Sequence, residues 1–488
     1  MLKAEYQTIK CERAASAEVR TSAEAALRTP EEIKKPISVS AAAFVTATED
    51  RGETTHVKAQ VAFRLVYLAE GGYKKCEAQA DIQAEIPLGN AAVIVKAEDA
   101  RVTLSGDGYV ARCSVTFVGE GTKTEEVKTV IGGDGLIVKE TAMSVDESVG
   151  RNFDEFTVSD EFETGYSISE VLAHGQSVRI KNVESGVSRV VVSGEVDVEV
   201  KALTAVGDDL VKERRNIPFR CEVACPGALP DMKARGGAEV RRAAYKVYAD
   251  EAKNKSSIAV EIVLFTYGEA IGCKDVSVVT DAYSLTDEVK LTETAVRTER
   301  FTGEKYKEER IISSASGDAP EGGRLVGAFG ETVGIISVDR NGGVTTVNGV
   351  VKADVAFRNA DNGTSCVVAE SPFSIEINDC DETRIKRVTL CDLAARVRNG
   401  GIEFEYVIGV RYGCYAAEET LCVTDAESAG ERKKKTCAIS VYIPKADDDL
   451  WDISKRLGLK EDDITALNPD LDFPLRGDER IVIYRQKV

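Results

Sequence analysis

The sequence predicts a mainly β protein: three tandem antiparallel β-sandwich or barrel-like repeats, followed by a small C-terminal unit of the order βααβ. Three observations support this fold class. Strand-like stretches with apolar residues at alternate positions recur along most of the chain, separated by turns rich in Gly, Asn and Asp. Three of these stretches can be superimposed as an internal repeat. The last segment, residues 438–488, changes to apolar residues at helical spacing.

The repeat is clearest in three strands that begin at Thr55, Arg189 and Thr345. When they are superimposed, four sets of small or apolar residues coincide: Ala59, Gly194 and Gly349; Val61, Val196 and Val351; Phe63, Val198 and Ala353; Leu65, Val200 and Val355. Because side chains alternate between the two sides of a strand, each copy has one apolar face. The opposite face of the second copy is charged, and we expect it to face solvent. It consists of Glu195, Asp197, Glu199 and Lys201.

Each copy continues with further strands. A shorter one follows in every copy (76–86, 214–223 and 369–377), and a longer apolar one closes it (109–120, 256–269 and 401–413). Strands at this spacing are typical of antiparallel sandwiches. We therefore expect three β-domains, with the first at residues 1–145, the second at 146–275 and the third at 276–424.

The polar segment after the third repeat, residues 425–437, predicts a flexible tether. It is charged and has no apolar periodicity. Its run of Lys433, Lys434 and Lys435 either contacts an acidic partner or is simply solvated.

The first half of the C-terminal segment predicts a strand and a helix. Alternation over 439–443 indicates a strand, and Pro444 ends it because proline cannot donate to a ladder. Asp448 or Asp449 can cap a helix. The helix has Leu450, Ile453 and Leu457 on one side, and Gly458 stops it.

The second half of the segment predicts another helix and a returning strand. Acidic residues in the first turn suit a helix over 461–467, since they lie at the positive end of its dipole. Asn468-Pro469 ends this helix, and residues 480–484 form the second strand.

This segment resembles a LysM module, a small βααβ recognition unit. It keeps Leu450-Trp451, Leu467-Asn468-Pro469 and Gly477 of the family pattern. The family's Gly-Asp-Thr before the first helix is replaced by three aspartates, Asp447 to Asp449. The resemblance implies a binding groove between this loop and the loop after the second helix, where the family holds N-acetylglucosamine polymers.

The resemblance gives a set of candidate binding residues on the two loops: Asp447, Asp448, Asp449, Leu450, Trp451, Asn468, Pro469 and Asp470. Three carboxylates suit a basic patch on a protein partner better than a glycan, although a solvated helix cap without a ligand explains them equally well. Trp451 is either an exposed anchor or packed against its own domain. Leu450 is either an anchor or a core residue.

The segments before the second and third repeats (156–180 and 276–301) also resemble each other. The later one contains Asp281-Ala282-Tyr283-Ser284, and the stretch TPEEIKKPISVSA surrounds Pro30 and Pro36. Together with the C-terminal module, this organisation resembles the DUF3794 or SPOCS family, in spore-envelope morphogenetic proteins of the SipL type.

The resemblance implies a non-catalytic scaffold or adaptor of spore coat assembly. Such proteins act in the mother-cell cytoplasm, at the forespore surface of sporulating Firmicutes. Their LysM module docks the morphogenetic ATPase of the coat basement layer (SpoIVA type), and other coat proteins are expected partners. The alternative is a peptidoglycan-binding protein of the cell wall.

Composition excludes several other classes. The net charge of −19 argues against nucleic acid and against an anionic membrane surface. No apolar run has the length of a secretory signal or of a membrane span, so we expect a cytoplasmic protein.

Residues for catalysis or metal binding are scarce. There are two histidines, His56 and His174, and neither lies in a catalytic motif. No GxxxxGK[ST] loop occurs, and we expect no cofactor, no metal and no enzymatic activity. The twelve cysteines are scattered without a CxxC pair, which favours reduced thiols.

Overall fold

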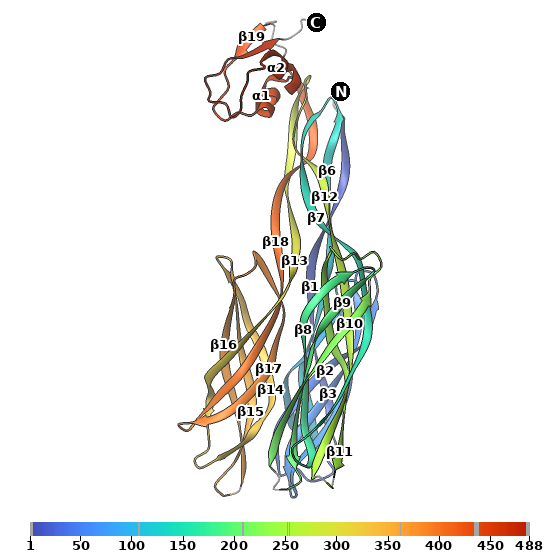
Figure 1. The fold of residues 1–488 in the computed structure, drawn as a ribbon, viewed down its shortest axis with the longest axis vertical. Coiled ribbons are helices and arrows are strands. Elements are labelled where there is room, and N and C mark those ends of the chain that lie inside the picture. The colour runs from blue at the N-terminus through green and yellow to red at the C-terminus, as the bar shows by residue number, and fades with distance from the viewer. Residues whose placement is uncertain are drawn as a thin grey trace.

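The chain forms an elongated molecule with a cluster of sandwiches at one end and a small helical module at the other (Figure 1). The computed structural model describes residues 3–105, 108–206, 209–250, 252, 254–361, 363–433 and 439–484. These residues form twenty strands and two short helices, so the predicted mainly β class is confirmed. Neither helix of the described chain is long and apolar enough to cross a membrane.

Three six-stranded units follow one another along the chain. The first consists of β1 (Lys3–Leu27), β2 (Lys35–Asp50), β3 (Thr55–Ala69), β4 (Gly72–Ile86), β5 (Ala92–Ser105) and β6 (Gly108–Asp134). The second consists of β7 (Ile137–Glu163), β8 (Ile168–Gly186), β9 (Arg189–Thr204), β10 (Leu210–Ala224), β11 (Lys233–Asp250) and β12 (Lys255–Tyr283). The third consists of β13 (Asp287–Asp318), β14 (Arg324–Asn341), β15 (Val344–Arg358), β16 (Thr364–Ile377), β17 (Glu382–Arg398) and β18 (Gly401–Glu431).

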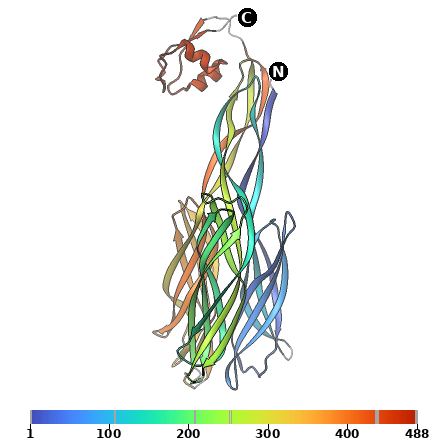
Figure 2. The ribbon, with the colours of Figure 1, turned by 45° about the vertical axis from the view of Figure 1, so that its right-hand side comes forward.

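All three units have the same topology, which confirms the internal repeat. The second, third and fourth strands form one antiparallel sheet, as in β2-β3-β4, and the first, sixth and fifth form the other, as in β1-β6-β5. The superimposed strands β3, β9 and β15 lie at the centre of the first kind of sheet. Their apolar faces are buried as predicted: Val61, Val196 and Val351 are each 0% exposed and pack in the three sandwich cores. Figure 2 shows the three sandwiches side by side.

A stalk of three two-stranded ribbons rises from the sandwiches (Figure 1). It begins where the fifth strand of each unit stops pairing, so that only the first and sixth strands continue as a pair. Its residues are 3–15 with 121–134, 137–147 with 272–283, and 287–300 with 416–431. Small apolar clusters hold the ribbons together, one of them around Ile9, Met143 and Val278.

The chain passes from one unit to the next at the stalk tip, at residues 135–136 and 284–286. The boundaries predicted at 145/146 and 275/276 therefore fall inside the long strands β7 and β12. The predicted tether over 425–437 is wrong for residues 425–431, which belong to β18 and pair with β13. Its residues 434–437, with Lys434 and Lys435, lie outside the described residues.

The charged face of β9 does not face solvent, contrary to our expectation. Asp197 is 6% exposed and Lys201 is 5% exposed, because the third unit covers this face. The Lys201 ammonium donates to the carbonyl of Ala328 at 2.8 Å and pairs with Glu331. Arg179 joins Asp197 to Glu308 of β13. Alternating charge thus marks an interface between repeats here.

The cysteines differ from the prediction at one place. Cys380 and Cys414 form a disulfide, with their Cα atoms 5.3 Å apart. They come from the turn after β16 and from β18, which are distant in sequence but adjacent in the third sandwich. The other described cysteines are free thiols, most of them buried, and Cys437 lies outside the described residues.

The C-terminal module (Ile439–Tyr484) has the predicted βααβ order. It consists of β19 (Ile439–Tyr442), α1 (Leu450–Leu457), α2 (Glu461–Leu467) and β20 (Ile481–Tyr484), with β19 antiparallel to β20. Asp449 is the N-cap of α1, and Gly458 ends the helix at φ 63°. Ile453, Leu457, Ile464, Leu475, Ile481 and Ile483 form its core.

Candidate functional site

The loop before α1 is ordered by its own aspartates. Asp447 is exposed and adopts φ 65°, a left-handed conformation that aspartate tolerates better than most residues. Its amide donates to the carbonyl of Leu475 at 3.0 Å, which ties this loop to the one before β20. Asp447 thus adopts a backbone conformation that glycine favours.

Asp448 is a structural residue. It is 8% exposed, and its carboxylate accepts from the Lys445 amide and the Arg456 guanidinium, each at 2.8 Å. The bond from Arg456 is the main reason why the pKa of Asp448 lies below its usual value. This carboxylate fixes the loop to α1 and is not available as a charge selector.

Asp449 has two partners. It accepts from the Asp452 amide at 2.7 Å in a capping box, and it pairs at 3.1 Å with Lys139 of β7. Burial raises the pKa of Asp449, but these two partners outweigh it, so the pKa is lowered overall. Asp449 therefore caps α1 and also links the module to the stalk.

Trp451 packs against the stalk tip. The side chain is 8% exposed, and its indole Nε1 donates to Asp281 Oδ2 at 2.8 Å. The ring meets Tyr283 edge to face, with 5.0 Å between centroids. Leu450 is half-buried against the module core. The sequence left open an exposed anchor or packing against the module itself; Trp451 is buried, but its partners belong to the stalk and not to the module.

The second loop is partly structural too. The Asn468 side chain donates to the carbonyls of Ile464 and Val482 at 2.8 Å and accepts from the Val482 amide at 2.7 Å. It thereby joins α2 to β20 and is fully engaged. Pro469 and Asp470 are exposed. Among the predicted site residues, Asp447, Asp449, Pro469 and Asp470 are therefore the exposed ones, and of these Asp449 is engaged by Lys139.

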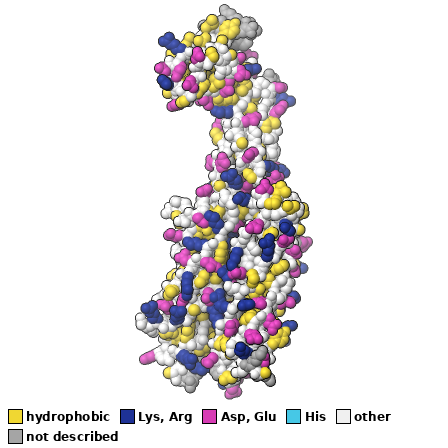
Figure 3. All heavy atoms as spheres, viewed as in Figure 1, with side chains coloured by type: hydrophobic (Ala, Val, Ile, Leu, Met, Phe, Trp, Pro, Cys, Tyr) yellow, Lys and Arg dark blue, Asp and Glu magenta, His cyan; other side chains and the backbone are white. Residues whose placement is uncertain are grey.

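A second surface of the module was not among the predicted residues. The outer side of the paired strands β19 and β20, together with the residue after β19, is called the sheet face here and consists of exposed apolar residues: Ile439, Val441, Ile443, Val482 and Tyr484. Ile439 lies opposite Tyr484, and Val441 opposite Val482, so their side chains share one side of this two-stranded sheet. Figure 3 shows hydrophobic side chains gathered on the module. The sequence signal was the alternation over 439–443, whose apolar residues are the ones that face outward.

The comparison with protein families concerns the second repeat. Residues 167–248 match the family model described as SipL, SPOCS domain. The matched SPOCS segment spans β8 to β11, and the match indicates a sporulation-related protein. No curated protein and no solved structure shows significant similarity to the chain. The SPOCS segment lies in the second of three units that share one topology.

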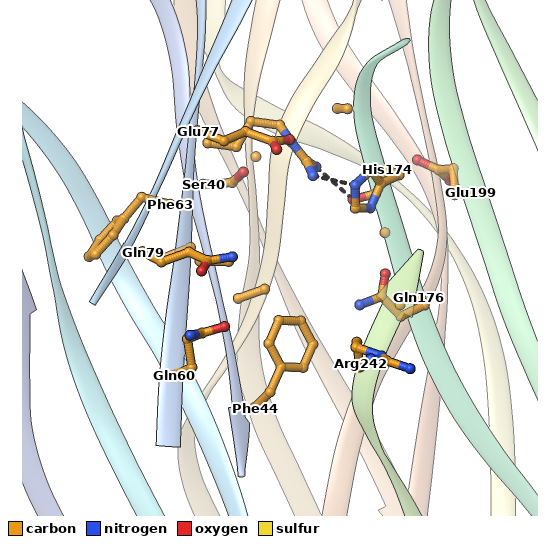
Figure 4. A pocket seen from close by; sticks show the side chains of 18 of the residues that line it. Ser40, Phe44, Gln60, Phe63, Glu77, Gln79, His174, Gln176, Glu199 and Arg242 are labelled. Atoms are coloured by element: carbon orange, nitrogen blue, oxygen red, sulfur yellow. Dashed lines mark hydrogen bonds and ion pairs between the residues drawn. The ribbon is translucent and has the colours of Figure 1, made fainter. Parts of the chain in front are cut away.

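The SPOCS segment also lines a cavity of about 390 Å³ against the first repeat (Figure 4). Ser40, Phe44, Gln60 and Gln79 come from the first repeat, and His174, Gln176 and Arg242 come from the SPOCS segment. Most charged groups here are paired within the protein: Arg64 with Glu77 at 2.8 Å, and Lys201 with Glu331.

His174 of the SPOCS segment is held as a neutral imidazole. Its Nε2 accepts from Arg64 at 2.6 Å, and its ring stacks on Tyr245 with 4.0 Å between centroids. Burial, together with the positive charge of Arg64, lowers the pKa of His174 to about 3. Because Nε2 already accepts a bond from a permanent cation, this histidine joins the two repeats and is poorly placed to act as a base.

Proposed function

We propose that this protein is a non-catalytic scaffold of spore coat morphogenesis, acting in the mother-cell cytoplasm at the forespore surface. In this proposal the C-terminal module is a LysM module that docks the morphogenetic ATPase of the coat basement layer. The three β-repeats hold other coat proteins or associate with one another. The SPOCS match within one of three equivalent repeats is the observation that carries the proposal.

The shape of the molecule supports an adaptor role. The stalk separates the sandwiches from the module, so the two ends can contact different partners (Figure 1). Apart from the module, the described chain consists of repeats whose charged side chains largely pair with one another, as in the contacts of Lys201 and Arg179. Such an architecture suits the positioning of partner proteins better than it suits catalysis.

Two features of the module favour a protein partner over a glycan. A carboxylate at Asp447 replaces the loop glycine that permits close approach of a sugar. The sheet face presents adjacent exposed apolar side chains, which are characteristic of protein interaction sites. Peptidoglycan binding is the second candidate, because Asp447, Pro469 and Asp470 remain exposed on the two loops that hold sugar in the LysM family.

The test compares two ligands of the full-length chain. Binding to the basement-layer ATPase of the same organism is measured by interferometry, and binding to purified peptidoglycan by co-sedimentation. The double variant Asp447→Asn/Asp470→Asn removes two loop charges while retaining a residue that tolerates a left-handed backbone. We expect it to weaken ATPase binding roughly tenfold, as loss of complementary charge does.

The matched control is Glu70→Gln/Asp231→Asn, which removes two exposed charges from the sandwiches. It should leave the affinity unchanged. Saturable co-sedimentation with peptidoglycan, without ATPase binding, would replace the proposal with the wall-binding alternative.

A further inference from the structure

Helix α1 uses two sides, and only one of them faces the module core. Leu450, Ile453 and Leu457 pack inward. A second stripe, with the i, i+3, i+4, i+7 spacing of one helix face, consists of Trp451, Ser454, Lys455 and Gly458. Ser454 is 0% exposed and Trp451 is 8% exposed. This stripe faces the stalk tip: Trp451 and Lys455 contact Asp281, and Gly458 lies beside the Arg432 side chain.

On the stalk, Asp281 is the centre of the contact. Its Oδ2 accepts from the Trp451 indole at 2.8 Å, and its Oδ1 pairs with the Lys455 ammonium. Both carboxylate oxygens are therefore engaged by α1. Burial alone would raise the pKa of Asp281, but the bonds from Lys455 and Trp451 outweigh it and lower the pKa.

Three further contacts surround this pair. The Tyr283 hydroxyl donates to the carbonyl of Leu459 at 2.8 Å. Arg432 donates to the carbonyl of Lys455 at 2.9 Å, near the C-terminal end of α1. Lys139 pairs with Asp449 at the N-terminal end of the helix. The stalk tip thus contacts α1 at both ends and in the middle. The contacting residues belong to β7, to β12 and to the position after β18.

The contact is specific but mostly polar. Apart from the Trp451–Tyr283 ring pair, these contacts are hydrogen bonds and ion pairs, whose net contribution is small because water replaces them on separation. Interfaces of this polar character between parts of one chain commonly permit relative motion. The contact also covers Trp451, which is the kind of aromatic side chain that most often anchors a protein interface.

We propose that the stalk tip is a latch that covers the α1 face of the module, and that a protein partner reaches Trp451 only after Asp281 and Tyr283 release it. The identity of that partner rests on the proposed function, whereas the latch itself does not. A latch that is closed in about nine molecules of ten weakens the apparent affinity of such a partner about tenfold. Stalk and partner therefore compete for one helix face.

The chain contains its own reporter of the latch, because Trp451 is its single tryptophan. Tryptophan fluorescence of the full-length protein, with acrylamide as the quencher, measures the exposure of this indole directly. Asp281→Asn opens the latch from the stalk side, and Lys455→Gln opens it from the module side. Both variants should shift the emission to longer wavelength and increase quenching.

The matched control is Asp275→Asn on the same strand, whose carboxylate accepts from Ser144 instead of from the module. It should leave emission and quenching as in the unaltered protein. Amide exchange of α1 and α2 shows that the module remains folded in each variant. If both latch variants keep the emission and quenching of the unaltered protein, the latch is disproved.

Binding to the basement-layer ATPase then tests the competition. We expect Asp281→Asn to tighten binding about tenfold, because the open fraction rises toward one. Unchanged or weaker binding by an opened variant would overturn the competition. If the fluorescence reports opening while no form of the protein binds the ATPase, the latch stands and the proposed function fails.

Discussion

The sandwiches and the stalk tip bury side chains in different ways. Each sandwich closes two sheets over one continuous apolar core, in which residues such as Phe63, Val196 and Phe404 are fully buried. The stalk has only small clusters between ribbons, and its contact with the module is mostly polar. Since apolar burial dominates folding free energy, the stability of the molecule is concentrated in the sandwiches. The contact between the stalk tip and the module can therefore open without unfolding the sandwiches.

The largest effect should come from removing a core aromatic in a sandwich. Phe404→Ala deletes a ring that is 0% exposed in the third repeat, and we expect a loss of about 3–5 kcal/mol in the free energy of unfolding. Tyr248→Ala removes a ring that is 52% exposed and should cost no more than about 0.5 kcal/mol. Urea denaturation followed by circular dichroism measures both. Equal costs would refute the concentration of stability in the cores.

The second prediction concerns the charged junction of the three repeats. Glu304 of β13 pairs with Lys386 of β17 and Arg411 of β18. Lys386 also pairs with Glu120 of the first repeat at 3.3 Å, and Arg411 donates to the carbonyl of Gly236 in the second. Burial would raise the pKa of Glu304, but the two cations outweigh it and lower the pKa.

Glu304→Gln leaves these buried cations without their shared carboxylate. We expect a loss of roughly 3 kcal/mol, the low end for breaking a buried ion pair. Glu70→Gln, at an exposed carboxylate, is the control. Because the pKa of Glu304 is lowered on folding, its contribution is present at neutral pH and is lost as the pH falls below the usual glutamate value. A cost that is already equal to that of Glu70→Gln at pH 7 would contradict the assignment.

The third prediction uses His174, between the first two repeats. Its pKa of about 3 in the folded protein lies below the value of about 6.5 in an unfolded chain. The unfolded chain therefore takes up a proton between these two values and the folded protein does not, so stability falls as the pH decreases. From pH 7 to pH 5 this amounts to about 2 kcal/mol.

His174→Gln removes that dependence, and its stability should change less than that of the unaltered protein over the same pH range. His56→Gln is the control, since it removes the other histidine of the chain. Urea titrations at pH 7, 6 and 5 give the comparison. If His174→Gln keeps the full slope, the histidine is not the group responsible.

The sequence predicted those features that depend on local pattern. The apolar faces of β3, β9 and β15 follow from alternation, and the ends of α1 follow from its capping aspartate and from Gly458. The burial of Lys201 could not be predicted in this way, because alternation shows that a face is charged but not that another repeat covers it. The predicted domain boundaries differ from those of the structure for a similar reason. A strand that runs through both sandwich and stalk has no turn signal where one ends and the other begins.

The candidate site shows the same limit. The loops of the module were found by resemblance, but the partners of Trp451 lie far away in the sequence, at Asp281 and Tyr283. No periodicity connects positions at such a separation. The segment Asp281-Ala282-Tyr283-Ser284 stood out as a family feature, and only the structure shows that it contacts α1.

The smallest predicted effect separates the two roles of Asp449. Asp449→Ala removes the N-cap of α1 and should destabilise the module by about 1 kcal/mol. Asp449→Asn keeps a good N-cap but loses the ion pair with Lys139. Both side chains of this ion pair are about half exposed. Exposed pairs contribute from about 0 to 1 kcal/mol, so the module should stay within about 0.5 kcal/mol of the unaltered protein.

Amide exchange of α1 measures the cap, and acrylamide quenching of Trp451 measures the contact with the stalk. Asp449→Ala should change both signals, whereas Asp449→Asn should raise quenching slightly and leave exchange unaltered. If Asp449→Asn speeds exchange as much as Asp449→Ala does, the helix depends on the stalk for its stability. The module would then not fold independently of the stalk. The sandwiches, whose cores are their own, would differ from the module in this respect too.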